Sequence, residues 1–134
     1  MKHIAKHVVR SYECDSYGHV NNAVYLNYLE YARMEHLHAI GFDYKGIIAG
    51  GYYLYVTHVD IYCKASPFLD DELFIEVFPV KTKHVSGTIH QIVRKADGTV
   101  CAEADVTWAC VNHEGKPCRI PQEFMVEGLL PESN

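Results

Sequence analysis

The segment from Glu13 to Asn22 holds, within ten positions, the residue types that acyl transfer needs. It contains a carboxylate at Asp15, a turn-forming glycine at Gly18 and a polar run that ends at Asn22. If a helix follows, the free N–H groups of its first turn stabilise negative charge on an approaching oxygen. A carboxylate held just before that helix faces the same oxygen, so the two form a nucleophile or base opposite an oxyanion hole. The residues fit equally well a structural interpretation in which Asp15 caps a turn and Gly18 bends it.

Cys14 is the alternative nucleophile in this segment. Adjacent side chains of an extended chain point to opposite sides, so only one of Cys14 and Asp15 can face a substrate. We favour Asp15 for that position. The sequence has no Gly-x-Ser-x-Gly motif, which excludes the serine route of the α/β-hydrolases.

The five cysteines predict neither a disulfide framework nor a metal site. Their number is odd and no Cys-x-x-Cys pair occurs, so we expect buried, unreactive thiols. Cys110, His113 and Cys118 match no common zinc spacing and lack a fourth ligand. We therefore expect no metal and no cofactor.

A long helix is expected directly after the polar run, over Asn22 to Ile40. Asn21 is a good N-cap and Gly41 a good stop. Residues on the expected buried side recur at steps of three and four: Tyr25, Leu26, Leu29, Ala32, Arg33, His36, Leu37 and Ile40. Glu30 and Glu35 fall on the polar side, and Arg33 is expected to pair with an acid such as Glu30.

Strands account for most of the remaining chain. The predicted ranges are Ile4–Tyr12 before the helix, then Tyr53–Lys64, Leu73–Lys83, Ser86–Lys95 and Thr99–Asn112. Asp97-Gly98 is a strong two-residue hairpin turn between the last two. This order predicts an α+β fold with one long central helix and a curved antiparallel sheet of about five strands. One helix covers a single face of such a sheet, so the open face and edges predict a homo-oligomer.

Length and charge exclude several classes of protein. The 134 residues suit one domain, spanning 1–134, and no apolar run reaches the length of a membrane span. No signal-peptide apolar region follows the first residues, so a cytoplasmic location is expected. Twelve basic against seventeen acidic residues give a net charge of −5, the wrong sign for a nucleic-acid binder. An anionic ligand therefore needs a local basic cluster.

Two short basic runs could supply that cluster. One is Lys81-Thr82-Lys83-His84 at the end of a predicted strand, and the other is Arg94-Lys95. They are either solvated strand ends or a grip on the phosphates of a ligand.

The motif Asp15-x-x-Gly18-His19-Val20-Asn21-Asn22-x-x-Tyr25-Leu26-x-Tyr28-x-Glu30-x-Ala32-Arg33 resembles a known family signature. It is similar to that of hotdog-fold acyl-CoA thioesterases of the 4-hydroxybenzoyl-CoA thioesterase type. The resemblance is sharpest to the bacterial long-chain acyl-CoA thioesterase branch, which shares the His-Val-Asn-Asn stretch. The run from Ser66 to Leu73 resembles the family's turn before the third strand.

The resemblance implies a hydrolase that releases a carboxylic acid and free coenzyme A from an acyl-CoA substrate. Asp15 falls on the catalytic aspartate, acting as nucleophile or general base, and Asn22 on the backbone N–H that polarises the thioester carbonyl. The substrate-binding residues it implies are Tyr17 and Tyr25 on the acyl pocket, with Gly18 and His19 shaping the loop. Lys81 and Lys83 then become candidates for the coenzyme phosphates. The family also implies dimers that pair into a tetramer.

Two other functions compete with this prediction. An acyl-carrier-protein thioesterase keeps the fold, but an acidic carrier needs a larger basic surface than this chain offers. A non-catalytic module that only binds acyl-CoA is the other alternative, and the intact Asp15 opposes it.

Overall fold

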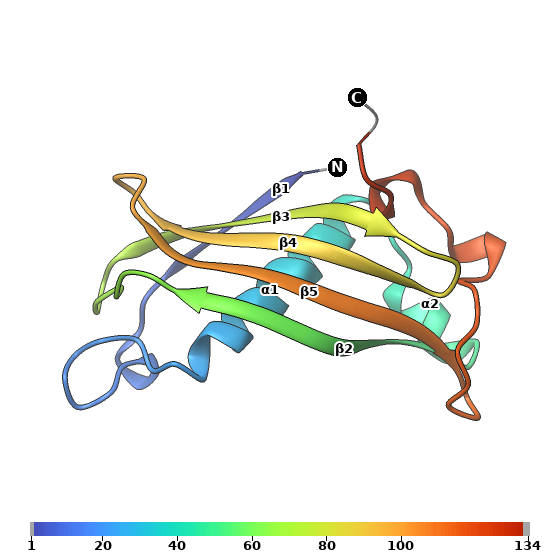
Figure 1. Ribbon diagram of the computed structural model, residues 1–134, viewed down its shortest axis with the longest axis horizontal. Helices are drawn as coiled ribbons and strands as arrows, with labels where there is room; N and C mark the ends of the chain where they lie inside the picture. Colours follow the sequence, from blue (N-terminus) through green and yellow to red (C-terminus); the bar gives the residue numbers. More distant parts are fainter. Residues whose placement is uncertain (1, 133–134) are drawn as a thin grey trace.

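The computed structural model describes residues 2–132 as one five-stranded antiparallel sheet with a long helix packed on one face (Figure 1). The strand order across the sheet is β1-β3-β4-β5-β2, so β1 and β2 form the two edges. The elements follow one another as β1 (His3–Val8), η1 (Ser11–Glu13), α1 (Val24–Ala39), α2 (Tyr44–Ala49), β2 (Tyr52–Cys63), β3 (Glu72–Thr82), β4 (Ser86–Lys95), β5 (Val100–Asn112), η2 (Gln122–Phe124) and η3 (Glu127–Leu129). This architecture confirms the α+β prediction.

The helix and the strands enclose one main core. Helix α1 buries Tyr25, Tyr28, Leu29, Ala32 and His36. These side chains meet the inward-facing apolar residues of the sheet, which include Leu73, Ile75, Val77, Val93 and Val106. A smaller core, built on Phe42, Ile47 and Leu129, lies under α2 and the C-terminal segment.

Helix α1 begins two residues later than predicted. Residues 22–23 form a turn, and the Asn21 side chain accepts the N–H of Ala23 at 3.0 Å one step before the helix. The buried face also differs from the prediction. Leu26 is 49% exposed while Tyr28 is 2% exposed, because the Tyr28 hydroxyl finds a partner in the interior.

The first strand is shorter than predicted, and α2 was not predicted at all. Strand β1 ends at Val8, because the chain then leaves the sheet to form the turn η1. Helix α2 has only six residues and contains a glycine, so its sequence carries a weak helix signal. The remaining strand predictions agree with the structure to within one residue at each end, and Ser86–Lys95 is confirmed at both ends.

Strand β2 is the long open edge of the sheet. None of its twelve residues is buried, although each of β3, β4 and β5 contains several buried residues. An edge strand with unpaired backbone groups is a template for pairing with another strand.

Within residues 2–132, no helix has the length and apolar character needed to cross a membrane.

Candidate active site

The segment between β1 and α1 forms a small hairpin, which we call the acid loop (residues 13–22). The N–H of Asn21 donates to the carbonyl of Glu13 at 2.9 Å, and the N–H of Asp15 donates to the carbonyl of His19 at 2.8 Å. Gly18 closes the tip with φ of +82°, a conformation that side-chain-bearing residues rarely adopt. Asp15 is therefore held on a defined backbone (Figure 1, the blue loop at one end of the molecule).

The carboxylate of Asp15 is exposed at this tip, and only one of its two oxygens accepts hydrogen bonds from the loop. Its Oδ1 accepts the N–H groups of Tyr17 at 2.9 Å and His19 at 3.3 Å. Among residues 2–132, no donor contacts Oδ2. Asp15 thus orders the turn through one oxygen and presents the other to solvent, so the structural and chemical interpretations of this residue are compatible.

Cys14 faces the other way. Its side chain packs against the main core, and its thiol donates weakly to the carbonyl of Arg10 at 3.7 Å. Loss of hydration raises the pKa of the Cys14 thiol, and the negative charges of Glu13, Asp15 and Asp70 raise it further. A thiol kept protonated is a poor nucleophile.

Glu13 anchors the acid loop to the interior of the protein. This role was not predicted from the sequence. Its buried carboxylate accepts the Arg10 N–H at 2.7 Å, the Nε2 of His7 at 2.9 Å and the Tyr28 hydroxyl at 3.0 Å. Burial alone raises the pKa of Glu13, but these hydrogen bonds outweigh it and hold the pKa below its usual value. One carboxylate therefore joins β1, the loop and α1.

The backbone leading into α1 leaves one donor free. The N–H of Asn21 goes to Glu13, that of Ala23 to the Asn21 side chain at 3.0 Å, and that of Val24 to the Asn21 carbonyl at 2.9 Å. In the described part of the chain, no group accepts from the N–H of Asn22. This unused donor lies at the residue predicted to polarise the thioester carbonyl.

The connection between β2 and β3 packs against the acid loop. The N–H of Val20 donates to the carbonyl of Pro67 at 3.1 Å, and the His19 ring meets the Phe68 ring edge-on with centroids 4.8 Å apart. The His19 ring therefore packs between the acid loop and the β2–β3 connection. Tyr17 is 84% exposed and free to contact a ligand.

Tyr25 lies in the main core and not on an open pocket. Its ring is 3% exposed and its hydroxyl donates to the carbonyl of Ala65 at 3.3 Å. A cavity does occur beside α1, but on the neighbouring face of the helix.

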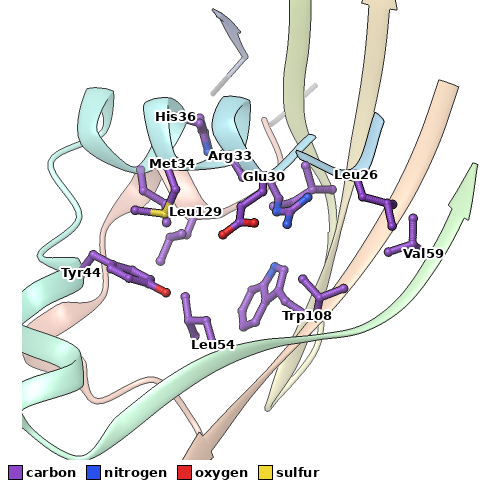
Figure 2. Close-up of a pocket in the computed structure, with 13 residues that line it drawn as sticks. Leu26, Glu30, Arg33, Met34, His36, Tyr44, Leu54, Val59, Trp108 and Leu129 are labelled. Carbon is purple, nitrogen blue, oxygen red and sulfur yellow. The ribbon is translucent and has the colours of Figure 1, made fainter. Parts of the chain in front are cut away.

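This cavity, which we call the helix cavity, has a volume of about 350 Å³ between α1 and the β2–β5 side of the sheet (Figure 2). It begins at Leu26 in the first turn of the helix. Its apolar lining includes Leu26, Met34, Leu37, Leu54, Val59 and Trp108, with Glu30 and Arg33 among them. Glu30 is exposed, as expected for the polar side of the helix, and it also borders this cavity. Arg33 donates to Gln91 at 3.1 Å and not to an acid, contrary to the prediction.

Lys81 and Lys83 lie at the opposite end of the sheet from the acid loop (Figure 1). Lys95, of the other predicted run, lies at the acid-loop end, where its Nζ is 4.9 Å from the centroid of the Phe68 ring that contacts His19. Lys83 and His84 line a second cavity of about 550 Å³ together with Arg119, whose Nη2 lies 2.7 Å from Nδ1 of His84. Lys81 is exposed near the end of β3. We call Lys81, Lys83, His84 and Arg119 the basic cluster. Arg119 was not predicted as part of this cluster, because it is 35 residues from His84 along the chain.

The cysteines near the C-terminus form a close pair. The sulfur atoms of Cys110 and Cys118 lie 3.7 Å apart as free thiols, and His113 is exposed away from them beside Glu114. Across residues 2–132, no group of three or more His, Cys, Asp or Glu side chains is arranged to hold a metal ion.

Comparison with known proteins identifies the family of the chain. Residues 9–127 match the model of the thioesterase-like superfamily. The chain belongs to this superfamily. It is 31% identical over 125 residues to the long-chain acyl-CoA thioesterase FadM of Escherichia coli (strain K12), covering 92% of this chain and 90% of the relative.

Two further similar proteins show that the superfamily includes thioesterases for different acyl thioesters. The chloroplastic acyl-acyl carrier protein thioesterase ATL3 of Arabidopsis thaliana is 30% identical over 87% of this chain and 62% of its own length. The crystal structure of a 1,4-dihydroxy-2-naphthoyl-CoA thioesterase from Synechocystis superposes with a TM-score of 0.85 over 91% of both chains at 19% identity. The predicted family and the hotdog fold are confirmed, and the chain is a thioesterase-family enzyme.

Proposed function

We propose that this thioesterase hydrolyses acyl-CoA thioesters to a carboxylic acid and free coenzyme A, with Asp15 and the Asn22 N–H at the reacting centre. The observation that carries the proposal is the unused pair of groups on the acid loop. Within residues 2–132, Asp15 Oδ2 has no donor and the Asn22 N–H has no acceptor, whereas Asp15 Oδ1 and the N–H groups of Asn21 and Ala23 are hydrogen-bonded. Similarity to the E. coli long-chain acyl-CoA thioesterase supports coenzyme A as the leaving group.

The two groups suit opposite needs of the reaction. As a general base, Asp15 takes a proton from water while the water oxygen attacks the thioester carbon. As a nucleophile, it attacks that carbon itself, and water then hydrolyses the anhydride. On either route the carbonyl oxygen becomes negative, and the Asn22 N–H donates to it near the positive end of α1. The coenzyme thiolate leaves when the tetrahedral species collapses.

A homo-oligomer is part of this proposal, because it places the basic cluster near a reacting centre. Within one protomer the cluster and the acid loop are separated by the length of the sheet, about 30 Å for a ten-residue strand. Strand β2 runs from the cluster end to the acid-loop end (Figure 1). If β2 pairs antiparallel with β2 of a second copy, the cluster of one copy lies beside the acid loop of the other. Lys81 and Lys83 then hold the phosphates of a coenzyme that reacts at the partner's loop, and two such dimers form a tetramer.

Acyl carrier protein is the second candidate for the leaving group, because ATL3 is similar along 87% of this chain. The net charge of −5 opposes docking of an acidic carrier.

We also propose that the protein acts in the cytoplasm, and cell fractionation tests this location.

The deciding experiment compares thiol release from matched acyl-CoA and acyl-carrier-protein thioesters by the wild-type chain and by Asp15→Asn. We expect release from acyl-CoA, with kcat at least a hundredfold lower in Asp15→Asn. The amide keeps an oxygen that accepts the Tyr17 and His19 N–H groups, so the loop stays folded. Tight acyl-CoA binding without any release would assign a non-catalytic module, and faster release from the carrier would assign the second candidate.

A further inference from the structure

The helix cavity contains two opposite charges in a mainly apolar lining, to which Tyr44 and His36 also contribute. Glu30 and Arg33 lie three residues apart on α1, and both side chains point from the helix into the cavity toward Trp108 (Figure 2). An apolar occupant strips water from these charges and offers no hydrogen bond in return. The pair therefore determines which occupants the cavity accepts.

Arg33 is held in place but retains hydrogen-bonding capacity. Its Nη1 donates to Oε1 of the buried Gln91 at 3.1 Å, and Nε2 of Gln91 donates to the carbonyl of Leu29 at 3.0 Å. In the described residues, nothing else accepts from the guanidinium, which has five N–H donors. Burial lowers the pKa of Arg33, and the negative charge of Glu30 opposes that shift. Arginine nevertheless stays charged in proteins, so an oriented cation with spare donors faces the cavity.

The two charges together discriminate among chemical groups. A carboxylate suits Arg33 but is repelled by Glu30, and an ammonium suits Glu30 but is repelled by Arg33. A keto oxygen accepts from Arg33 and leaves Glu30 without a donor. A hydroxyl accepts from the guanidinium and donates to the carboxylate, so it serves both at no cost in net charge.

The position of the pair along α1 sets where the hydroxyl must be. Glu30 is eight residues beyond Asn22, about 12 Å along the helix, and helical side chains tilt back toward the N-terminus. The Glu30 carboxylate therefore lies about 10 Å from the proposed oxyanion-binding N–H, and the Arg33 side chain reaches back beside it (Figure 2). At about 1.2 Å per bond in an extended chain, this distance corresponds to about eight bonds.

We infer that the helix cavity receives an aliphatic acyl chain bearing a hydroxyl near its eighth carbon, with that hydroxyl bound between Arg33 and Glu30. This inference rests on the proposed function, because the thioester is taken to react at Asn22. It makes Arg33 and Glu30 specificity-determining residues and not catalytic ones.

The first test compares hydrolysis of 8-hydroxyoctanoyl-CoA and octanoyl-CoA. We expect kcat/KM to be about tenfold higher or more for the hydroxylated substrate, as for hydrogen bonds to charged groups. Arg33→Met and Glu30→Met should each abolish the preference, whereas Arg33→Lys should keep part of it. Glu30 is exposed, so its variant folds even if the loss of Arg33 disturbs Gln91. Glu35→Met, on the same helix outside the cavity lining, is the matched control and should keep the full preference.

The second test does not depend on catalysis. Trp108 is the single tryptophan of the chain and lines the helix cavity, so its fluorescence reports binding of 8-hydroxyoctanoate and octanoate. We expect tighter binding of the hydroxy acid to the wild-type chain and equal binding to Glu30→Met. Equal kcat/KM for the two thioesters, or equal affinity for the two acids, overturns the inference. If neither thioester is hydrolysed, the proposed function falls, and the fluorescence titration alone decides the role of the cavity.

Discussion

The hydroxyl of Tyr28 donates a 3.0 Å hydrogen bond to the carboxylate of Glu13, which ties the long helix to the loop that carries Asp15. Tyr28 is buried, and burial together with this bond raises the pKa of its hydroxyl, so it remains a donor. The same carboxylate also binds Nε2 of His7. Two elements of the scaffold therefore converge on one residue of the loop.

Glu13→Gln should lower the free energy of unfolding by about 1.5–3 kcal/mol at pH 7, because a neutral amide replaces a buried carboxylate with three donors. The pKa of Glu13 is depressed in the folded state, so its stabilisation is present above the unfolded pKa and is lost as pH falls through the folded one. Urea titrations at pH 7 and at acidic pH should therefore show the gap between variant and wild type closing. Tyr28→Phe, which removes one donor, should cost less, and a gap that does not change with pH would contradict this account.

Cys14→Ala should leave kcat within a few-fold of the wild type. The thiol faces the core and its pKa is raised by loss of hydration and by nearby carboxylates, so it is neither placed nor ionised for attack. Alkylation kinetics give an independent check, because a protonated thiol reacts slowly at pH 7. An inactive Cys14→Ala beside an active Asp15→Asn would transfer the nucleophile to the cysteine.

Charge removal in the basic cluster should raise KM several-fold with kcat nearly unchanged. Contacts to the coenzyme phosphates are the same in the ground and transition states, so they affect binding only. Lys83→Met and Arg119→Met are the informative variants, because both residues line the second cavity. Lys116→Met, on an exposed lysine outside that lining, is the matched control. Pantetheine thioesters, which lack the nucleotide, should be insensitive to all three changes, and an equal effect on them would make the cluster an ordinary solvated surface.

Lysines on the open edge should prevent assembly. Tyr55 and Tyr62 on β2 are 54% and 66% exposed, and lysine at both positions makes two like-charged edges meet. We expect light scattering at micromolar concentration to give an oligomer for the wild type and a smaller species for the double variant. Activity on acyl-CoA should fall with assembly, because the basic cluster then loses its partner loop. A wild-type monomer that is fully active would exclude a shared site.

The sequence predicted most of the fold, because its patterns record local geometry. The strand Ser86–Lys95 follows from alternation. A turn at Asp97-Gly98 follows from turn chemistry, but residues 96–98 separate the hydrogen-bonded Lys95 and Thr99, so the predicted two-residue length was wrong. Which helix face is buried did not follow. Tyr28 replaces Leu26 in the interior, because a partner fifteen residues away satisfies its hydroxyl. A hydrogen bond between side chains far apart in the sequence cannot be predicted from hydrophobic periodicity.

The same limit applies to the site. The acid loop and Gly18 were predicted from residue types, and the loop has the expected turn. Glu13 was missed, because a buried acid is unusual unless donors from other elements surround it. Arg33 was expected beside an acid, but its hydrogen bond goes to Gln91, 58 residues away on the sheet. Tertiary contacts of this kind determine the surroundings of a charged side chain, and they leave no local pattern in the sequence.

Pairing of β1 with β3, and not with its neighbour in sequence, also has a consequence for the time course of folding. Ala5 lies opposite Ile75, seventy residues along the chain, so β1 cannot dock until the distant strand has formed. The hairpin of β4 and β5 closes locally and carries Trp108, whereas the loop with Asp15 hangs between β1 and α1. Non-local pairings form slowly because chain closure must come first. After dilution from denaturant, tryptophan fluorescence should therefore recover before enzymatic turnover, and the interval between them measures the docking of the first strand.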